Sequence, residues 1–461
     1  MGLIRNEVKK QRRHCRIRDL FIRAGRAVQV LKPCFLMSPL SVSQYIVPDA
    51  VEFDLVLIDE ASQVKPEDAL GTILRARQLV VVGDANQLPP TSFFDRVTDE
   101  VDDEEETQFD NAESILEVAT KAFQPVRRLR WHYRSQHESL IQFSNHHFYD
   151  NDLIVFPSPS RDSGRLGVVY HQIEGGWFKK GENPEEAKRV VEAVITHLRR
   201  YPNESLGVGA LNLKQSRLIE EILDAECQKH PDVMEAISRR QHLQEPIFIK
   251  NLENLQGDER DVICISCTYG PDPTTGRLMN RFGPINGPAG WRRLNVLVTR
   301  ARQRLELFSS MQPHEINAGP EKPRGVIALR NYLEYALTGG STGHQFVNEY
   351  ELRTAFEHTV SRIVEKAGLV PVPRIGVAGF FLDMGVRNPN GNPDFLLGIQ
   401  YDGPCYRSSK STRDRDRLQD EVVLSRGWQL HRLWSLDWFM NQAYEEERLL
   451  SVLASLPKGD H

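Results

Sequence analysis

The chain has 461 residues, 40% of them hydrophobic, which is enough for several folded cores and excludes a disordered chain. Its 58 basic and 63 acidic residues give a formal net charge of -5, so no overall basic field favours nucleic-acid binding, and any such binding must be local. No apolar run reaches the roughly 20 residues of a membrane helix, and the six scattered cysteines fit no disulfide framework, so we expect a cytoplasmic protein without membrane contact.

The N-terminal segment, residues 5–32, is rich in Lys and Arg. Apolar residues between Ile17 and Val28 recur at helical spacing, which predicts an amphipathic helix with a basic outer face. Such a face is most simply solvated, and contact with nucleic acid is the alternative.

Two short apolar runs come next, FDLVLI at 53–58 and QLVVV at 78–82, and acidic and polar residues follow each of them. Runs of this kind are typical of buried parallel strands, whose carboxyl ends carry the ligand sites of open α/β sheets. The acidic tract 99–107 has no apolar anchors and predicts a solvated loop. We therefore assign residues 1–125 to a first, partial α/β domain.

Residues 126–325 alternate helical stretches with apolar runs such as SLGVGAL and DVICISC, which predicts a second parallel α/β domain. Cys264 and Cys267 lie in one of these runs, where residues three apart face opposite sides of a strand. We interpret them as core residues rather than metal ligands. Gly- and Pro-rich punctuation predicts a helix-bearing connector, with the linker at 326–343, and a smaller unit follows at 344–461.

The chemistry of the first domain is concentrated in LIDEAS, which places Asp59 and Glu60 at the end of a strand. This pattern matches a Walker B element, in which one carboxylate holds Mg²⁺ and the next orients and deprotonates the attacking water. Adjacent carboxylates are common on surfaces, but the apolar run before them argues against a merely solvated pair.

Together with GDANQLPP, LRWHYRSQHESL, LENLQGDERDVICIS and LNVLVTRARQRLELF, this element resembles motifs II to VI of Superfamily 1 helicases of the Upf type. The resemblance implies RecA-like domains that use ATP and Mg²⁺ and act on nucleic acid. It implies that Asp84 and Gln87 couple the γ-phosphate to domain movement. Arg134 and the arginine finger Arg300 would balance charge on the transferring phosphoryl group. The residues implied near the nucleotide sugar and the nucleic-acid backbone are Gln256, Gly257 and Glu259.

Taken singly, each of these arginines would more simply be a surface residue or an ion-pair partner, and the family order of the motifs favours the helicase. The sequence contains no GxxxxGK[ST], the loop whose backbone N–H groups and lysine cradle the β- and γ-phosphates. We therefore expect this chain alone to bind ATP weakly. A gene fragment, a split enzyme completed by a second polypeptide that carries the P-loop, and an inactivated remnant remain open.

From about residue 344, FEHTVSRIVEKAG, FFLDMGV, IQYDGPCYRSSKSTRDRDRL and GWQLHRLWSLDW resemble PD-(D/E)xK endonucleases of the very-short-patch-repair type, a domain carried by large prokaryotic helicases at their C-terminus. Glu357, Asp383 and Asp402 occur where the resemblance implies acids, and the last two are the implied Mg²⁺ ligands. Gln400 replaces a usual acid and Arg407 a usual histidine, so we expect weak or lost cleavage. Simple solvation of the strand-end acids is the alternative.

Basic residues of this unit are predicted to contact nucleic acid, with DNA expected in preference to RNA; they are Lys410, Arg413, Arg415 and Arg417. They alternate with Asp414 and Asp416, and an exposed helix laced with ion pairs would have the same pattern. The sequence does not choose between the two.

The expected fold is α/β: RecA-like parallel-sheet domains, the first one incomplete, followed by a restriction-endonuclease-like α/β domain. Three functions are compatible with these features. The first is an ATP-dependent nucleic-acid helicase or translocase of which this chain is the C-terminal part. The others are an Mg²⁺-dependent DNA endonuclease and a non-catalytic nucleic-acid-binding remnant.

Overall fold

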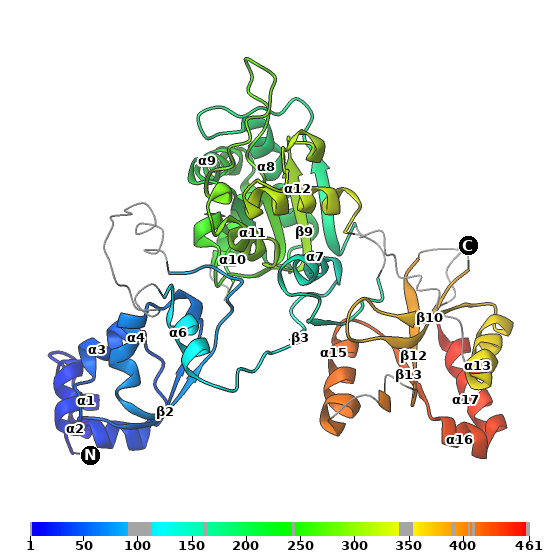
Figure 1. Cartoon of the computed structure of the whole chain (residues 1–461), viewed down its shortest axis with the longest axis horizontal. Coiled ribbons are helices and arrows are strands. Elements are labelled where there is room, and N and C mark those ends of the chain that lie inside the picture. The colour runs from blue at the N-terminus through cyan, green and yellow to red at the C-terminus, as the bar shows by residue number, and fades with distance from the viewer. Residues whose placement is uncertain are drawn as a thin grey trace. The chain divides into compact units, whose positions relative to one another are not determined.

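The computed structural model describes residues 2–90, 112–160, 164–241, 245–340, 354–389, 393–403, 406–407 and 411–457. The chain divides into two compact units, Met1–Arg128 and Leu129–His461, which run from blue to cyan and from cyan to red in Figure 1. In the described residues no helix is both long and apolar enough to cross a membrane. The predicted acidic loop at 99–107 and Lys410 lie outside the described residues.

The first unit is built around two parallel strands, β1 (Phe53–Ile58) and β2 (Ala76–Val81). Alternate residues of both strands pack against α4 (Pro66–Ile73) and α6 (Ile115–Ala122), because successive strand side chains point to opposite faces. The predicted N-terminal amphipathic helix is confirmed as α2, although its backbone is non-helical at Ala24. The remaining helical elements are α1 (Gly2–Lys9), α2 (Ile17–Leu31), α3 (Pro39–Tyr45) and the short η1 (Ala61–Gln63).

The opposite face of this strand pair is apolar and exposed. Leu55, Leu57 and Val80 are 47%, 58% and 42% accessible to solvent. Leu57 and Val80 are paired across the two strands, so these side chains form one patch. An apolar sheet face of this kind costs free energy in water, at about 25 cal/mol per Å².

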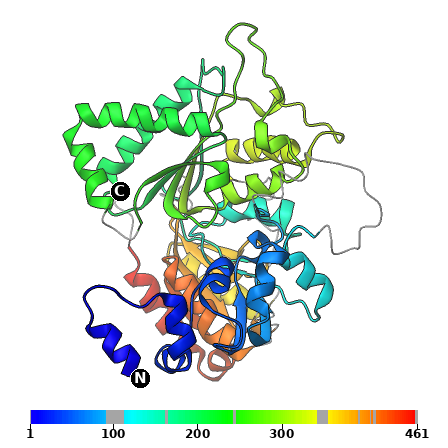
Figure 2. The same cartoon turned by 90° about the vertical axis from the view of Figure 1, so that its left-hand side faces the viewer.

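The second unit contains a parallel sheet covered by helices on both faces. Among its described residues, five parallel strands pair in the order β5–β9–β8–β6–β7. Helices α8 to α10 pack on one face and helices α7, α11 and α12 on the other, as Figure 2 shows. The strands are β5 (Gly167–Gln172), β6 (Leu206–Ala210), β7 (Phe248–Asn251), β8 (Arg260–Ser266) and β9 (Ala301–Ser309). The helices are α7 (Ser139–Phe148), α8 (Pro184–Arg200), α9 (Leu213–Lys229), α10 (Pro231–Gln241), α11 (Gly290–Val298) and α12 (Arg324–Leu337).

The two cysteines of β8 and its carboxyl end are buried on opposite faces of this sheet. Cys264 packs in the cluster beneath α8 and α9, whereas Cys267 packs in the cluster beneath α11 and α12. The prediction that they are core residues is confirmed. Burial raises the pKa of both thiols, which makes them poor metal ligands and nucleophiles.

Helix α12 corrects the predicted connector at 326–343. Val326, Leu329 and Leu333 are buried in the same core as the sheet. Their spacing of three and four residues gives the helix an apolar face that covers the sheet, so the helix belongs to this domain. The glycines and prolines on either side only mark its ends.

The C-terminal lobe has a mixed sheet with the strand order β10–β11–β12–β13 among its described residues. The first two pairs are antiparallel and β12 and β13 are parallel, and α13 and α17 help to close its core. The predicted α/β architecture is therefore confirmed. The elements are α13 (Ala355–Lys366), β10 (Val370–Ile375), β11 (Leu382–Arg387), β12 (Phe395–Tyr401), α15 (Gln419–Ser425), β13 (Leu430–Leu433), α16 (Ser435–Met440) and α17 (Gln442–Ser455).

Candidate nucleotide and nucleic-acid site

The predicted Walker B acids and coupling residues lie at one edge of the β1–β2 pair. Asp59 and Glu60 follow β1, and the other two residues, Asp84 and Gln87, follow the adjacent parallel strand β2. The Glu60 N–H donates to Asp59 Oδ1 at 2.9 Å, and Gln87 Nε2 donates to Asp84 Oδ2 at 3.0 Å. The carboxylates of Asp59 and Glu60 are exposed, so they are open to a metal ion and to water.

The two motifs also touch through their backbones at Gly83. The Ala61 N–H donates to the Val82 carbonyl at 2.9 Å. A Cβ atom on Gly83 would lie 3.0 Å from the backbone nitrogen of Ser62 and 3.1 Å from that of Ala61. The GDANQ motif therefore needs glycine because the chain after β1 passes directly over this residue.

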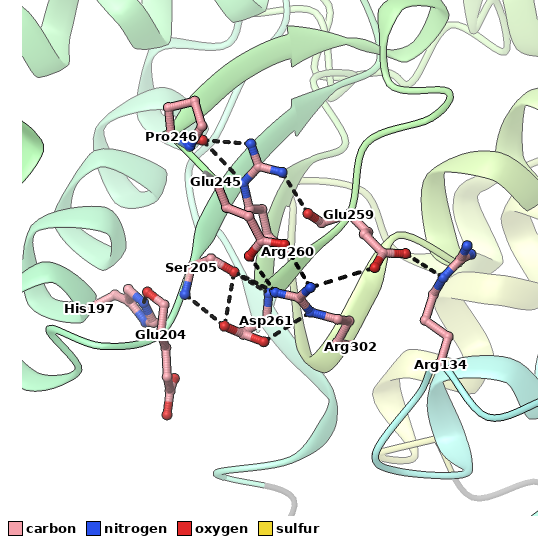
Figure 3. A network of polar contacts seen from close by, with 10 residues as sticks. All are labelled: Arg134, His197, Glu204, Ser205, Glu245, Pro246, Glu259, Arg260, Asp261 and Arg302. Carbon is pink, nitrogen blue, oxygen red and sulfur yellow. Dashed lines mark hydrogen bonds and ion pairs between the residues drawn. The ribbon is translucent and has the colours of Figure 1, made fainter. Parts of the chain in front are cut away.

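In the second unit, residues of three predicted motifs meet in one polar cluster (Figure 3). Arg134 Nε lies 2.6 Å from Glu259 Oε2, and Arg302 Nη1 lies 3.5 Å from Glu259 Oε1. Arg134 and Glu259 were predicted separately from motifs IV and V, and the fold brings them together. Both side chains are partly exposed, and a pair of this kind contributes about 1 kcal/mol or less, so Arg134 can exchange the carboxylate for a phosphate.

Arg302, at the start of β9, is the centre of this cluster, and the sequence prediction did not include it. Its Nε lies 3.0 Å from Asp261 Oδ1, and its Nη2 lies 2.6 Å from Glu245 Oε2 and donates to Ser205 Oγ at 3.0 Å. The hydrogen bond to Glu245 is the main reason that the pKa of Arg302 is raised. In the sequence, the acids of GDERD and the second arginine of VTRARQ, which is Arg302, are the features from which this cluster could have been predicted.

Replacing Arg302 by methionine is expected to destabilise the second unit by about 2 kcal/mol, since the change leaves several partly buried carboxylates without their common cation. Chemical denaturation followed by circular dichroism measures this free energy. The matched control is Arg239→Met, which breaks only the exposed helical pair with Glu235. The control should change the stability by less than about 0.5 kcal/mol. Equal losses in the two variants would contradict a central role for Arg302.

The predicted arginine finger, Arg300, is turned inward in this structure. Its side chain is buried, Nε donates to the Val296 carbonyl at 2.8 Å and Nη2 donates to Thr299 Oγ1 at 3.0 Å. These bonds hold the guanidinium against the end of α11. To reach a phosphate, the guanidinium must exchange a carbonyl and a hydroxyl acceptor, both uncharged, for an ionised oxygen.

The motif V residues lie in the turn before β8. Gly257 has a φ of 88°, the left-handed region that glycine enters without a steric penalty. Gln256 Nε2 is buried and has no hydrogen-bond partner among the described residues. A buried amide donor without a partner is costly, which suits a group that binds a ligand.

The turn that presents Arg134 is closed by His132. His132 Nε2 lies 2.8 Å from Ser135 Oγ, and the Ser135 N–H donates to the same ring nitrogen at 3.3 Å. Burial, aided by the charges of Arg426 and Arg134, lowers the pKa of His132 to about 3. The folded protein therefore keeps this imidazole neutral, as an acceptor within the turn.

Acid is expected to destabilise the second unit through His132. The folded state disfavours the charged imidazole of His132. The stability that the neutral ring provides is therefore fully present above pH 6.5 and is lost as the pH falls towards 3. By pH 4 the loss is about 3 kcal/mol. Denaturation between pH 4 and 7 measures it, and His132→Gln should flatten the slope relative to the wild type. Parallel slopes for the two proteins would contradict the role of His132.

The acids predicted for the endonuclease-like lobe mainly hydrogen-bond to its own backbone and side chains. Glu357 caps α13 by accepting from the Thr354 N–H at 3.1 Å, and Asp383 Oδ2 accepts from the Tyr401 N–H at 2.8 Å. Asp402 accepts from the backbone and hydroxyl groups of Ser435, at 2.9 and 2.6 Å. Burial raises the pKa of Asp383 to about 6 despite the Tyr401 bond, and the Glu357 charge adds to the rise.

The donor set of this lobe does not fit a catalytic Mg²⁺ ion. Gln400 Oε1 accepts from Arg432 at 3.1 Å, so an amide and a guanidinium stand beside the strand-end acids. Arg432 itself pairs with Asp420 at 2.8 Å, and both Asp402 oxygens already accept hydrogen bonds. In the described residues no cluster of three or more acidic, histidine or cysteine side chains could hold a metal.

The basic stretch of this lobe is partly neutralised. Arg415 pairs with Asp416 at 2.9 Å, and Arg417 pairs with Glu421 at 2.9 Å. Arg407 Nε donates to the Asp402 carbonyl at 2.9 Å, which occupies the side chain that replaces the expected histidine. The alternative of an ion-pair-laced helix therefore accounts for Arg415 and Arg417, whereas Arg413 is exposed.

Comparisons with known proteins match three parts of this chain to domain families and most of it to longer proteins. Two models described as an AAA domain match residues 34–94 and 111–312, and the restriction-endonuclease model REase_MTES_1575 matches residues 356–453. The chain is 32% identical over 423 residues to the uncharacterized ATP-dependent helicase MG140 of Mycoplasma genitalium, and 30% identical over 434 residues to its homolog in Mycoplasma pneumoniae. Each match covers 87% of this chain and 37% of the relative.

A more distant relative is the DNA polymerase alpha-associated DNA helicase A of Saccharomyces cerevisiae. It is 25% identical over 342 residues, which cover 67% of this chain and 46% of the yeast protein. The chain thus spans less than half the length of each of these three relatives.

Proposed function

We propose that the chain forms the C-terminal part of an ATP-dependent nucleic-acid translocase, because two AAA-domain models and a restriction-endonuclease model match it and its Mycoplasma relatives are ATP-dependent helicases. In this proposal both the acids of the first unit and the arginines of the second serve ATP hydrolysis. The observation that carries it is the placement of Asp59, Glu60, Asp84 and Gln87 at the carboxyl ends of two adjacent parallel strands.

Asp59 and Glu60 suit a metal-assisted hydrolysis. Asp59 is an exposed strand-end carboxylate that would hold the Mg²⁺ of a bound nucleotide, and this ion would screen the phosphate charge. Glu60 has a φ of 50°, in the left-handed region, and its side chain is exposed. It would accept the proton of the attacking water. Gln87, tied to Asp84, would sense the γ-phosphate.

The arginines would act on the developing charge of the phosphoryl group. Arg134 is already partly exposed, and it would leave Glu259 for a phosphate oxygen. Arg300 would leave the Val296 carbonyl and act as the arginine finger. Gln256, Gly257 and Glu259 would contact the nucleotide sugar and the nucleic-acid backbone.

We further propose that a second polypeptide segment carrying the P-loop completes the first domain. The exposed apolar face of Leu55, Leu57 and Val80 supports this, because a RecA-like sheet is normally covered by helices on both faces. That segment would supply the backbone N–H groups and the lysine for the β- and γ-phosphates.

For the endonuclease-like lobe we propose DNA binding with weak or lost cleavage. The neutral Gln400, which bonds to Arg432 where an acid is usual, supports this proposal, because an amide supplies no charge to offset Mg²⁺. The exposed Arg413 would add a backbone contact. Nicking of a supercoiled plasmid by the wild type, lost in Asp383→Ala, would contradict this proposal and favour the endonuclease.

The translocase proposal is tested by measuring ATP hydrolysis with the P-loop polypeptide present, with and without single-stranded DNA or RNA. The expected result is hydrolysis that nucleic acid stimulates, together with nucleic-acid binding that weakens as salt rises. Stronger stimulation by DNA than by RNA would support the expected preference. Salt-dependent binding without any hydrolysis would instead favour a non-catalytic binding protein.

A further inference from the structure

The endonuclease-like lobe contacts the two segments that flank Arg134 in the chain. These segments contain two short strands, β3 (Trp131–His132) and β4 (Ile154–Val155), which pair in parallel. The Val155 N–H donates to the Ala378 carbonyl at 2.9 Å. Phe156, next in the chain, is fully buried with Phe380 and Trp428 in a shared apolar cluster.

Polar bonds fix the same contact in one register. Trp428 Nε1 donates to the Pro157 carbonyl at 2.9 Å, and the Phe395 N–H donates to the Pro159 carbonyl at 2.9 Å. Backbone carbonyls that accept bonds from another lobe cannot slide without losing them. The strand pair is therefore held to the lobe by directional bonds as well as by apolar packing.

Arg426 is the centre of this contact. It is buried, and its Nη1 donates to the Phe156 carbonyl at 2.9 Å while its Nη2 donates to the His132 carbonyl at 3.3 Å. One guanidinium thus joins β3 to the residue that follows β4. Burial lowers the pKa of Arg426 to about 10, and the charge of Glu138, which is buried and accepts from the Ser158 N–H at 2.8 Å, opposes this shift. A buried cation with directional bonds to two segments fixes their relative position.

The bond from Arg426 to the His132 carbonyl links the endonuclease-like lobe to the turn that contains Arg134. His132 also closes the turn that contains Arg134, through its ring nitrogen and Ser135. We propose that Arg426 is a positioning residue for Arg134, so that the endonuclease-like lobe sets the geometry of the ATP site even if it cuts no DNA. The catalytic role of Arg134 in this inference rests on the proposed function. The claim that Arg426 orders the turn containing Arg134 is independent of it.

The structural part is tested by hydrogen–deuterium exchange on the chain without nucleotide. In Arg426→Met the amides of residues 131–136 and 154–158 should exchange about tenfold faster, while those of β8 stay unchanged. The control is Arg413→Met, which removes an exposed arginine of the same lobe and should change neither segment. If Arg426→Met unfolds the whole unit, the same exchange measurement is made on the milder variants Arg426→Lys and Trp428→Phe. Unchanged local exchange in those two variants overturns the proposal.

The catalytic part is tested with a double-mutant cycle on ATP hydrolysis, with the P-loop polypeptide present. Arg426→Lys should lower kcat about tenfold with little change in KM. The double variant Arg134→Ala with Arg426→Lys should be no slower than Arg134→Ala alone, because Arg426 acts through Arg134. Additive losses overturn the proposal. If the wild-type protein does not hydrolyse ATP, the proposed function fails. The hydrogen–deuterium exchange experiment then still shows whether Arg426 orders residues 131–136.

Discussion

Replacing Glu60 by glutamine is expected to slow ATP hydrolysis between about 100-fold and 10,000-fold, because the amide keeps the shape of the side chain and cannot accept the proton of the attacking water. Nucleotide binding should change little, since Asp59 remains to hold the metal ion. The measurement is steady-state hydrolysis in the presence of the P-loop polypeptide and nucleic acid. Binding of a fluorescent nucleotide, measured separately, distinguishes lost chemistry from lost affinity.

The matched control for this variant is Glu67→Gln, which neutralises an exposed carboxylate in the first turn of α4. It changes the net charge of the same unit by the same amount and should leave hydrolysis unchanged. If Glu60→Gln hydrolyses ATP at the wild-type rate, the strand-end acid is a solvated surface residue and the Walker B assignment fails.

Replacing Arg300 by alanine is expected to lower ATP turnover by about 1,000-fold or more, the usual effect of losing an arginine finger. The structure adds a second expectation, because Arg300 also bonds to Val296 and Thr299 at the end of α11. Its loss should reduce the free energy of unfolding by about 1–2 kcal/mol. Turnover and denaturation must therefore be measured on the same preparation.

Thr299→Val separates these two roles of Arg300. It removes the hydroxyl that accepts from Nη2, so it should show part of the stability loss while keeping the guanidinium. Its turnover should stay within a few-fold of the wild-type value. A turnover loss in Thr299→Val as large as in Arg300→Ala would show that Arg300 only supports α11.

Local patterns predicted the strand ends of the first unit and core residues of the second. A short apolar run followed by acids is a local signal for a strand end, and it placed Asp59 and Asp84 correctly after β1 and β2. The alternation of a strand placed Cys264 and Cys267 on opposite faces for the same reason. The helix expected in the connector at 326–343 packs in the core of the second unit, because its apolar residues recur at helical spacing.

The sequence by itself determined which elements form and which residue types stand at their ends, because both depend on neighbours within a few positions. Only the tertiary structure decided which partners those side chains meet. Arg302 joins a serine and acids up to 97 residues away, and Arg426 reaches a carbonyl 294 residues earlier. Contacts over such separations depend on how whole layers pack, and periodicity along the chain carries no information about them.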